Sequence, residues 1–348
     1  VTNFAIKAHL PVDGLIRATV FDHFCGGVNE NDCLSVVDKM FTKGVSSVLD
    51  YSVEGKEEET QFDAALAMTL KTIEFAKERQ AIPFAVFKPT GLGRLDLYEK
   101  VGSKVALSAS EQEEWDRVVD RFDLVCKTAH YKDVALLIDA EESWMQDAAD
   151  DLVTQMMQKY NKDKAVVFNT LQMYRWDRLD YLKQLHEQAK KDGFFIGMKL
   201  VRGAYMEKEN ARAEQKGYPT PICSSKEATD INYDAAVLYM LDHIESMAIF
   251  AGTHNELSSY TLMHLMEERG IKNNDERIWF GQLYGMSDNI SYNLAANRYN
   301  VSKYLPFGPV KDVMPYLIRR AEENTSVAGQ TSRELSMLKA ERSRRKSL

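Results

Sequence analysis

The chain lacks several features that would place it in a special class of protein. No apolar run reaches the roughly 20 residues that a helix needs to span a bilayer. Its four cysteines show no metal-ligand spacing and are too few for a disulfide framework, so we expect unpaired thiols and no metal site. Proline and glycine nowhere gather into a linker, and no internal repeat or low-complexity segment occurs. These absences argue against a membrane-spanning protein, a disulfide-stabilised scaffold and a repeat protein.

The chain also lacks an excess of basic residues. With 52 acidic and 44 basic side chains its net charge is -8, which argues against a nucleic-acid partner. One basic cluster, Arg342-Ser343-Arg344-Arg345-Lys346, could contact acidic lipid or RNA, or simply end a frayed helix. A composition of 45% hydrophobic and 28% charged residues predicts a soluble globular protein with one large core.

Short apolar segments rich in β-branched residues alternate with amphipathic segments along most of the chain. The expected strands cover 46–51, 84–88, 134–139, 165–169, 196–201, 248–253, 278–282 and 300–304. The expected helices cover 34–41, 59–79, 111–128, 143–160, 176–191, 232–245, 256–269 and 311–324. This alternation predicts an α/β protein built as a closed parallel (βα)8 TIM barrel inside a ring of helices.

The main rival to the barrel is an open doubly wound sheet. That fold normally has a glycine-rich phosphate turn after an early strand, and Gly91-Leu92-Gly93 lacks both the later glycine and the helix. We therefore expect a barrel over residues 45–325, preceded by a helical segment (1–44) packed on it and followed by a helical extension (326–348). A further helix is expected within that extension, over 331–344.

Polar side chains occupy the carboxyl ends of the expected strands. Barrel active sites lie at this rim, so these residues are candidates for lining a pocket that binds a polar ligand. The alternative is that the strand ends are only solvated. The candidates are Asp50, Lys88, Asp139, Asn169 with Gln172, Lys199 with Arg202, Thr253-His254-Asn255, Gln282 and Tyr304.

The last expected helix carries a pair of arginines. Tyr316, Arg319, Arg320 and Glu323 are spaced by three or four residues and share one broad helix face. Adjacent arginines point about 100° apart, so they can hold one anion from two sides. The guanidinium group suits this task because its planar fork binds a carboxylate through two hydrogen bonds. The alternative is a solvated basic patch on an exposed helix face.

Several of these segments together resemble the proline dehydrogenase family and fall in that family's order. The resemblance covers residues 44–324 and rests on Asp139-Ala140-Glu141-Glu142, Lys199-Leu200-Val201-Arg202-Gly203-Ala204-Tyr205, Thr253-His254-Asn255, Gln282-Leu283-Tyr284-Gly285-Met286 and Tyr316-Leu317-Ile318-Arg319-Arg320. It implies a distorted (βα)8 barrel that uses FAD to oxidise L-proline to Δ1-pyrroline-5-carboxylate by hydride transfer to flavin N5, the first step of proline catabolism. It also implies a quinone electron acceptor and peripheral membrane association. The location would be a bacterial cytoplasm, at the inner membrane, or the matrix side of the mitochondrial inner membrane.

The resemblance assigns a substrate role to eight residues and none as an obligatory acid or base. The carboxylate would be held by Lys88, Arg319 and Arg320, the ring would be walled by Tyr205, Leu283, Tyr304 and Tyr316, and Asp139 would support this pocket. In the family a tyrosine at the Tyr304 position fills the space that a ring hydroxyl would need. We therefore expect a preference for proline, with hydroxyproline or another cyclic imino acid as the alternative substrate.

The resemblance also assigns residues to FAD. Lys199 would bond the N5 edge of the flavin, where the family often has arginine, so the flavin potential is expected to differ from that of arginine-bearing relatives. Asn169 or Gln172 would contact the polar ring edge, and these two remain alternatives. The remaining contacts would come from Val201, Gly203, Ala204, Ser224, Ser225, Lys226, Thr253, His254, Asn255, Gln282, Arg320 and Glu323.

Two other classes of function fit parts of the sequence. Lys199 or Lys88 could be the buried nucleophile of a Schiff-base aldolase, because both stand at strand ends. The other is a non-catalytic barrel that captures an amino acid or a protein partner, with the basic tail and the long N-terminal segment as contacts; it would bind proline without reducing any acceptor. The aldolase would be trapped by borohydride, whereas a flavoenzyme would be yellow.

Overall fold

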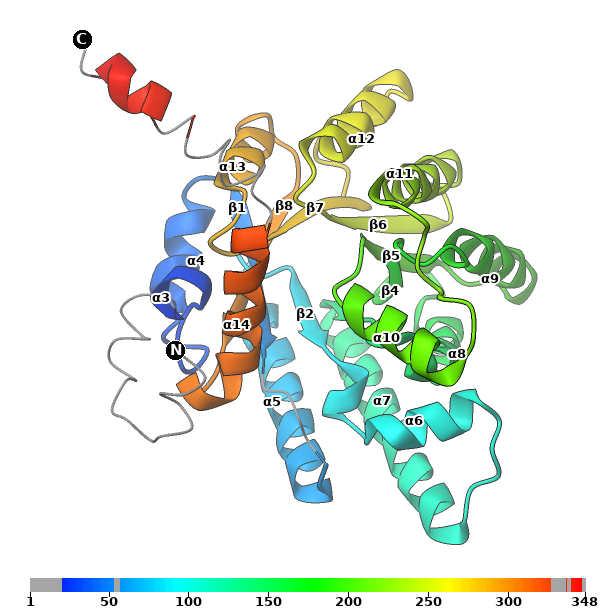
Figure 1. The fold of residues 1–348 in the computed structure, drawn as a ribbon. Coiled ribbons are helices and arrows are strands. Elements are labelled where there is room, and N and C mark those ends of the chain that lie inside the picture. The colour runs from blue at the N-terminus through cyan, green and yellow to red at the C-terminus, as the bar shows by residue number, and fades with distance from the viewer. Residues whose placement is uncertain (1–20, 53–56, 327–335, 337–338, 346–348) are drawn as a thin grey trace.

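The structure is a computed structural model that describes residues 21–52, 57–326, 336 and 339–345, with only the backbone given for 321–326. Eight parallel strands close a barrel in chain order, since β1 pairs with both β2 and β8 (Figure 1). They are β1 (Val45–Tyr51), β2 (Phe84–Phe87), β3 (Ala135–Ile138), β4 (Val167–Gln172), β5 (Ile196–Val201), β6 (Met247–Gly252), β7 (Ile278–Leu283) and β8 (Val301–Phe307). The predicted closed barrel is confirmed.

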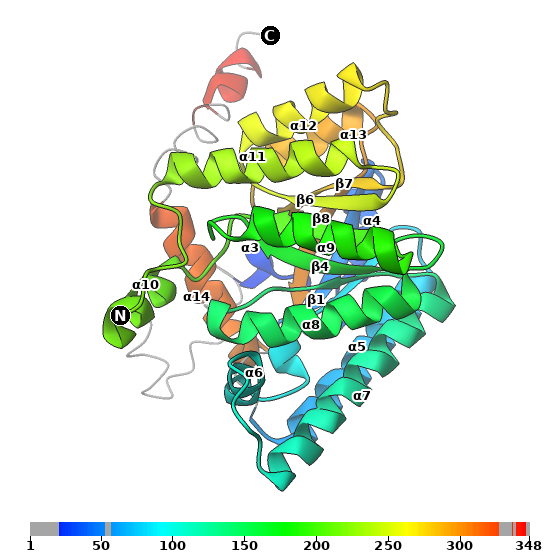
Figure 2. The ribbon, with the colours of Figure 1, turned by 90° about the vertical axis from the view of Figure 1, so that its right-hand side faces the viewer.

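Helices surround the strands in both views (Figures 1 and 2). Those expected from the sequence are α4 (Leu34–Phe41), α5 (Glu59–Lys77), α7 (Ala109–Lys132), α8 (Ser143–Tyr160), α9 (Arg178–Asp192), α11 (Lys226–Asp242), α12 (Glu256–Glu268) and α14 (Val310–Ser326). A short helix, α3 (Asp22–Phe24), lies within the segment 1–44 that was expected to be helical. Elements not anticipated are the 3-10 turn η2 (Pro89–Gly91), α6 (Leu95–Gly102), α10 (Met206–Lys216) and α13 (Asp288–Ala296). Of the described helices, none is long and apolar enough to cross a membrane.

The barrel is uneven around its circumference. The β1–β8 ladder has seven paired positions, whereas β3 and β4 pair at only two, Leu136 with Val167 and Leu137 with Phe168. Two strands run three residues further than expected, β4 to Gln172 instead of Asn169 and β8 to Phe307 instead of Tyr304. The carbonyl of Pro306 still accepts a hydrogen bond of 2.8 Å from the Gly26 backbone. This N-terminal segment therefore pairs with the end of β8.

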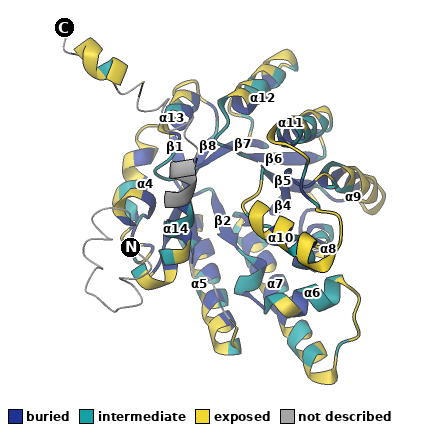
Figure 3. Ribbon diagram, in the orientation of Figure 1, coloured by how far each residue is buried: buried dark blue, intermediate teal, exposed yellow. Residues whose placement is uncertain are grey.

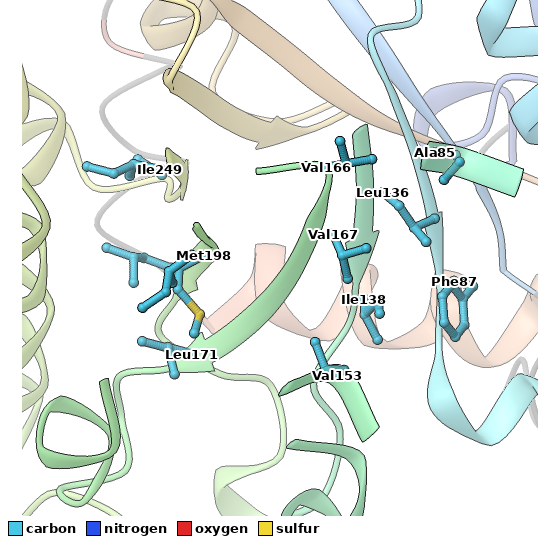
Figure 4. Packing of buried hydrophobic residues seen from close by; sticks show 14 of the residues in the cluster. Ala85, Phe87, Leu136, Ile138, Val153, Val166, Val167, Leu171, Met198 and Ile249 are labelled. Carbon is cyan, nitrogen blue, oxygen red and sulfur yellow. The ribbon is translucent and has the colours of Figure 1, made fainter. Parts of the chain in front are cut away.

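Side chains alternate between the two faces of the barrel wall, as the period of a strand requires. Outward residues such as Leu136, Val167 and Met198 belong to the main core under the helices (Figure 4). Inward residues such as Phe84, Phe168 and Phe250 form a separate aromatic cluster that fills the barrel. The strands are accordingly buried on both faces (Figure 3). Apolar residues thus fill the interior of the barrel, and the polar residues begin nearer the carboxyl ends of the strands.

The segments that flank the barrel are described only in part. In the N-terminal segment, Phe21, Phe24 and Cys25 pack against Val313 and Leu317 of α14. Residues 1–20 lie outside the described residues, so packing of the whole 1–44 segment stays a prediction. Of the helix expected over 331–344, residue 336 and residues 339–345 are helical, and the rest lies outside the described residues.

Candidate active site

A cavity of about 980 Å³ opens at the carboxyl ends of the strands. Its volume lies at the upper end of the usual range for ligand sites, about 300–1,000 Å³. Helices α10 and α14 both lie at this end of the barrel (Figures 1 and 2). Every strand or the residue after it contributes to the lining, including Asp50, Lys88, Asp139, Gln172, Lys199, Thr253, Leu283 and Tyr304.

Strand alternation places the charged residues directly above the aromatic filling. In β1, Asp50 follows the inward Val48 by two residues, and after β3 Asp139 follows the inward Leu137 in the same way. Lys88 stands in the same relation to the inward Val86. Side chains two residues apart share a face of a strand. The sequence therefore turns from apolar to charged at one level of the barrel.

Two lysines and two aspartates form a connected cluster at this level. Lys199 forms an ion pair with Asp139 and donates a 2.9 Å hydrogen bond to the hydroxyl of Tyr304. The Lys88 ammonium lies 3.3 Å from a carboxylate oxygen of Asp139 and 3.6 Å from one of Asp50. The four formal charges cancel. Each buried charge thus has a partner of opposite sign, which is the condition for keeping charges away from water.

The pKa values of the cluster follow from this pairing. Burial alone would raise the pKa of Asp139, but Lys199 and Lys88 outweigh it and hold that pKa below its ordinary value. Burial would lower the pKa of Lys88, but Asp50 and Asp139 raise it well above its usual value. For Lys199 burial prevails and lowers the pKa, against the opposing effect of Asp139. Burial also raises the pKa of Tyr304, whose phenol stays neutral.

The arginine pair of α14 reaches the same cavity, together with Tyr316. Arg320 is only 8% exposed, and its guanidinium lies 5.4 Å from the centre of the Tyr316 ring. Burial raises the pKa of Tyr205 against the opposing charge of Arg319, whereas burial and the charges of Lys303 and Arg320 together lower the pKa of His254. The two guanidinium groups therefore act on different walls of the cavity. A solvated basic patch does not describe this position.

All eight residues expected at the substrate line the cavity. So do eleven of the residues expected at the cofactor: Gln172, Lys199, Val201, Gly203, Ala204, Lys226, Thr253, His254, Asn255, Gln282 and Arg320. Ser224 and Ser225 do not line it, and Ser225 instead caps α11 by accepting a 3.1 Å hydrogen bond from the Ala228 backbone. The side chain of Glu323 lies outside the described residues.

The structure separates the two alternatives on β4. Asn169 lies on the outer face of the strand, where its amide donates a 2.9 Å hydrogen bond to Asp150. Gln172 lines the cavity and donates to the backbone oxygen of Glu141 at 2.5 Å. Phe168, which fills the barrel, differs from Gln172 by an even number of residues and from Asn169 by an odd number. Gln172 is thus the one that the strand directs inward.

His254 is held as a neutral group. Its Nδ1 lies 2.9 Å from the hydroxyl of Ser287, and burial, together with the charges of Lys303, Arg320 and Arg202, lowers its pKa to about 3. A histidine with this pKa is a very weak proton acceptor and stays neutral at neutral pH. His254 is therefore poorly suited to act as a base and is better described as an ordinary residue of the cavity rim.

Two cavity residues stood among the strand ends but received no role from the sequence. Asp50 pairs with Lys88 and accepts a 2.6 Å hydrogen bond from Ser52. Arg202, which follows β5, donates hydrogen bonds to Asp230 of α11 at 2.6 Å, to Thr253 after β6 at 2.7 Å and to Ser258 of α12 at 2.9 Å. It therefore connects the end of β5 with the end of β6 and with helices α11 and α12. The signal that could have identified both is a charged residue at or just after the end of a buried strand.

A bound cofactor would find open backbone and free hydrogen-bonding capacity here. Gly203 has φ +122, and a Cβ there would lie 2.4 Å from the Tyr174 ring, so the backbone borders the cavity without a side chain. Lys226 begins α11, whose first backbone amides favour anions. Among the described residues, the buried Tyr316 hydroxyl has no hydrogen-bond partner. Within the cavity these groups fit a ligand that carries phosphates and polar ring edges.

A closed parallel barrel with a large charged cavity at the carboxyl ends of its strands is the arrangement of a barrel enzyme. A sequence profile described as proline dehydrogenase matches residues 33–333. The chain belongs to the proline dehydrogenase family and is thus an oxidoreductase.

The chain is similar to several individual proteins. The carbapenem antibiotics biosynthesis protein CarD of Pectobacterium carotovorum subsp. carotovorum is 36% identical over 95% of this chain and 86% of its own length. Mitochondrial proline dehydrogenase 1 of Homo sapiens is 40% identical over 68% of this chain but only 40% of its own length. Proline utilization A from Bdellovibrio bacteriovorus has the same fold, with a TM-score of 0.80 and 23% identity over 93% of this chain and 34% of that one.

Stability should fall with rising pH because of one buried acid beside the cavity. Glu141 accepts hydrogen bonds from the Thr90 backbone at 2.9 Å and hydroxyl at 2.6 Å, yet burial raises its pKa from 4.5 to about 7. The folded protein therefore binds this proton more tightly than the unfolded chain. The stabilisation is complete below pH 4.5 and lost as the pH rises through about 7, by about 3 kcal/mol in all.

The measurement is urea unfolding of the parent and of Glu141→Gln at pH 5 and pH 8. The neutral amide can accept from the Thr90 N–H and donate to the Thr90 hydroxyl but cannot ionise, so the variant should gain stability relative to the parent as the pH rises. A difference between the two proteins that is the same at both pH values would contradict the raised pKa.

Proposed function

We propose that this protein oxidises L-proline to Δ1-pyrroline-5-carboxylate with FAD as cofactor. The single observation that carries the proposal is a cavity, in a chain of this family, where cations meet aromatic walls. The cations are Lys88 after β2 and the two arginines of α14, and the walls are Tyr205 before α10, Tyr304 of β8 and Tyr316 of α14. In this oxidation the ring carbon next to nitrogen loses a hydride, the nitrogen loses a proton, and a C=N bond forms. FAD, when bound, supplies the acceptor for the hydride.

The cationic residues would fix the substrate by its carboxylate. A guanidinium has five N–H donors, so Arg319 and Arg320 can keep their present partners and still form a two-bond contact with a carboxylate. Lys88 is already balanced by Asp50 and Asp139 and would add one further donor. Holding the carboxylate at this end fixes the ring carbon, and positioning of this kind supplies a large part of the rate in hydride transfer.

The aromatic residues would complete the pocket. Tyr304 is held by Lys199 at 2.9 Å, and its ring packs against Phe250 with centroids 5.9 Å apart. Tyr205, Leu283 and Tyr316 would enclose the remaining sides of the proline ring. The residues that would hold FAD are those of β5, the start of α11 and the β6 end that line the cavity, together with Gln172 and Gln282.

The first test is the visible spectrum of the purified protein before and after anaerobic addition of L-proline. A flavin band that proline bleaches would support the cofactor and the half-reaction together. A bound flavin that proline leaves oxidised would overturn the substrate, and a protein that stays colourless and inert with added FAD would overturn the whole proposal.

The proposal extends to the partners of the reaction. We propose a quinone as the electron acceptor, reached by peripheral contact with a membrane, and proline catabolism to glutamate as the pathway. A second candidate pathway is biosynthetic, because CarD, which covers nearly the whole chain, is named for carbapenem biosynthesis. The two pathways share the half-reaction and differ in the enzyme that consumes the product. Co-purification with membranes and reduction of a soluble quinone analogue test the acceptor.

Tyr304→Ser should weaken proline turnover at least tenfold and raise the ratio of hydroxyproline to proline turnover by a similar factor. In the family a tyrosine at this position fills the space that a ring hydroxyl would need; the phenol of Tyr304 is buried, and serine would free that space. Tyr304→Phe is the matched control, because it keeps the ring and loses only the hydroxyl. The quantity to measure is kcat/KM for both substrates, and an unchanged ratio in the serine variant would remove the argument for proline preference.

A further inference from the structure

Helix α10 is exposed over most of its surface yet contains one fully buried acid. The helix follows the cavity residues Gly203, Ala204 and Tyr205 directly, and Figure 3 shows most of it as exposed. Its only buried residues are Ala213 and Glu209, and Glu209 has 0% exposure. Acidic side chains are almost never fully buried unless they are paired. The buried carboxylate therefore needs a structural reason.

The partner of Glu209 is the first residue of α8. One carboxylate oxygen accepts from the Ser143 backbone N–H at 2.7 Å, and the other accepts from the Ser143 hydroxyl at 2.5 Å. The N-cap residue of α8, Glu142, makes no side-chain cap of its own. Early N–H groups of a helix lack intrahelical acceptors, and a negative charge is favourable at this end. Glu209 thus provides, from another helix, the cap that α8 lacks locally.

This contact joins two parts of the cavity wall. On one side, the Glu209 backbone N–H donates to the Tyr205 carbonyl at 2.9 Å, in the first turn of α10. On the other side, Ser143 ends the short loop that begins with the cavity residues Asp139 and Ala140. The carboxylate therefore fixes the distance between the wall segment after β5 and the wall segment after β3.

The other contacts of α10 with this region are less buried. Lys208 reaches Glu142 at 2.9 Å but is 65% exposed, and Arg212 pairs with Glu99 and lies 4.4 Å from the centre of a Trp144 ring. Exposed ion pairs contribute little, typically below about 1 kcal/mol. A buried carboxylate with two donors is costlier to disrupt, because the Ser143 N–H would be left without a partner.

The same type of contact occurs once more in the neighbouring wall. Glu141 accepts from both the backbone N–H and the hydroxyl of Thr90, which follows Lys88 by two residues. The loop after β3 is thereby tied to the segment after β2 as well as to α10. Three stretches of cavity wall, which carry Lys88, Asp139 and Tyr205, are connected through two buried carboxylates.

We propose that Glu209 is a positioning residue for the oxidation: its buried carboxylate holds the Tyr205 wall against the Asp139 loop and so sets the affinity of the enzyme for its amino-acid substrate. This inference rests on the proposed function. Glu209 does not line the cavity and acts through Tyr205 and Asp139. Misplacement of binding groups by about 1 Å costs up to a hundredfold in rate, so loss of this tie should be visible in kinetics.

The experiment compares three variants of the full chain loaded with FAD. Glu209→Met has a similar length but no acceptor, and we expect it to raise the KM for L-proline about tenfold, with kcat changed less than threefold. Glu209→Gln can accept from the Ser143 N–H and donate to its hydroxyl, so it should restore KM to within about threefold of the parent. Glu207→Met, on the same helix at an exposed position, is the matched control and should leave KM unchanged.

A second readout follows the contact itself. Hydrogen exchange of the Ser143 amide should accelerate in Glu209→Met and stay slow in Glu209→Gln, whether or not proline is the substrate. Faster exchange with KM within twofold of the parent would mean a purely structural cap and would overturn the inference, as would a raised KM with unchanged exchange.

If Glu209→Met does not fold, Ser143→Ala is the variant to test. We expect it to raise KM about threefold, and an unchanged KM would overturn the inference. Failure of the parent to be reduced by proline would instead mark failure of the proposed function.

Discussion

Replacing Arg319 with methionine is expected to raise the KM for L-proline at least a hundredfold while FAD stays bound. Arg319 lines the cavity near Tyr205, at the end where the substrate carboxylate is proposed to lie. Hydrogen bonds to charged groups contribute about 1.5–3 kcal/mol each, and a two-bond contact would be lost. A loss of about 3 kcal/mol corresponds to more than a hundredfold in KM. Steady-state kinetics with proline and the flavin absorbance per protein chain are the two measurements.

The size of this effect should depend on position rather than on removing any cation from α14. Lys311→Met is the matched control, because Lys311 is exposed on the same helix and does not line the cavity. It should leave KM within twofold of the parent. An unaltered KM in Arg319→Met, with flavin content intact, would remove Arg319 from the carboxylate clamp.

The second large effect is expected for Lys199→Met, which should lower the free energy of unfolding by about 3 kcal/mol at pH 7. The change leaves Asp139 buried with Lys88 as its remaining cation at 3.3 Å, and it frees the Tyr304 hydroxyl from its 2.9 Å donor. Removing one partner of a buried ion pair typically costs about 3–5 kcal/mol, because the other charge is left uncompensated. The Lys199 ammonium contacts both Asp139 and the Tyr304 hydroxyl, so the variant loses both interactions.

The loss of stability in Lys199→Met should depend on pH in a defined direction. In the parent, the lowered pKa of Asp139 provides stability that is present at neutral pH and is lost as the pH falls through that pKa. In Lys199→Met the pKa of Asp139 should rise, so protonation relieves its buried charge earlier on acidification. The deficit relative to the parent should therefore shrink between pH 7 and pH 4, as measured by urea unfolding at several pH values.

Lys190→Met is the control for the stability measurement. Lys190 pairs with Glu187 at 2.8 Å one helical turn away, and both side chains are at least half exposed. Such a pair contributes about 0.5 kcal/mol or less. If both lysine variants lose the same free energy of unfolding, the buried Asp139–Lys199 pair contributes no more to stability than an exposed pair, and the prediction is wrong.

Much of the barrel can be predicted from local patterns of apolar and polar residues in the sequence. The strands were predicted within a few residues because each is a short apolar segment that is buried on both faces. The exceptions are instructive. Gln172 was left outside β4, and α10 was not anticipated because its composition is almost wholly polar and only Ala213 and Glu209 are buried. A helix that is held in place by hydrogen bonds to other elements has no hydrophobic face, so the apolar periodicity used to predict helices is missing from its sequence.

The candidate site was predictable at the level of strand ends and less so at the level of contacts. A charged residue after a buried strand predicts a position on the rim, and this locates Lys88, Asp139 and Lys199 in the cavity. It does not predict that Lys88 is shared between Asp50 and Asp139, since that depends on the distance across three neighbouring strands. The roles assigned by resemblance to Ser224 and Ser225 stay predictions at positions outside the cavity lining.

The sequence by itself determined the barrel, its polar rim and the arginine pair of α14, because the period of a strand and the spacing of a helix are local properties of the chain. Only the tertiary structure decided which side chains share a contact. Gln172 rather than Asn169 faces the cavity because of the register in which β4 is placed, and Glu209 meets Ser143 across 66 residues of sequence. Contacts of that kind depend on how separate βα units are fixed around a closed barrel, and no short segment contains that information.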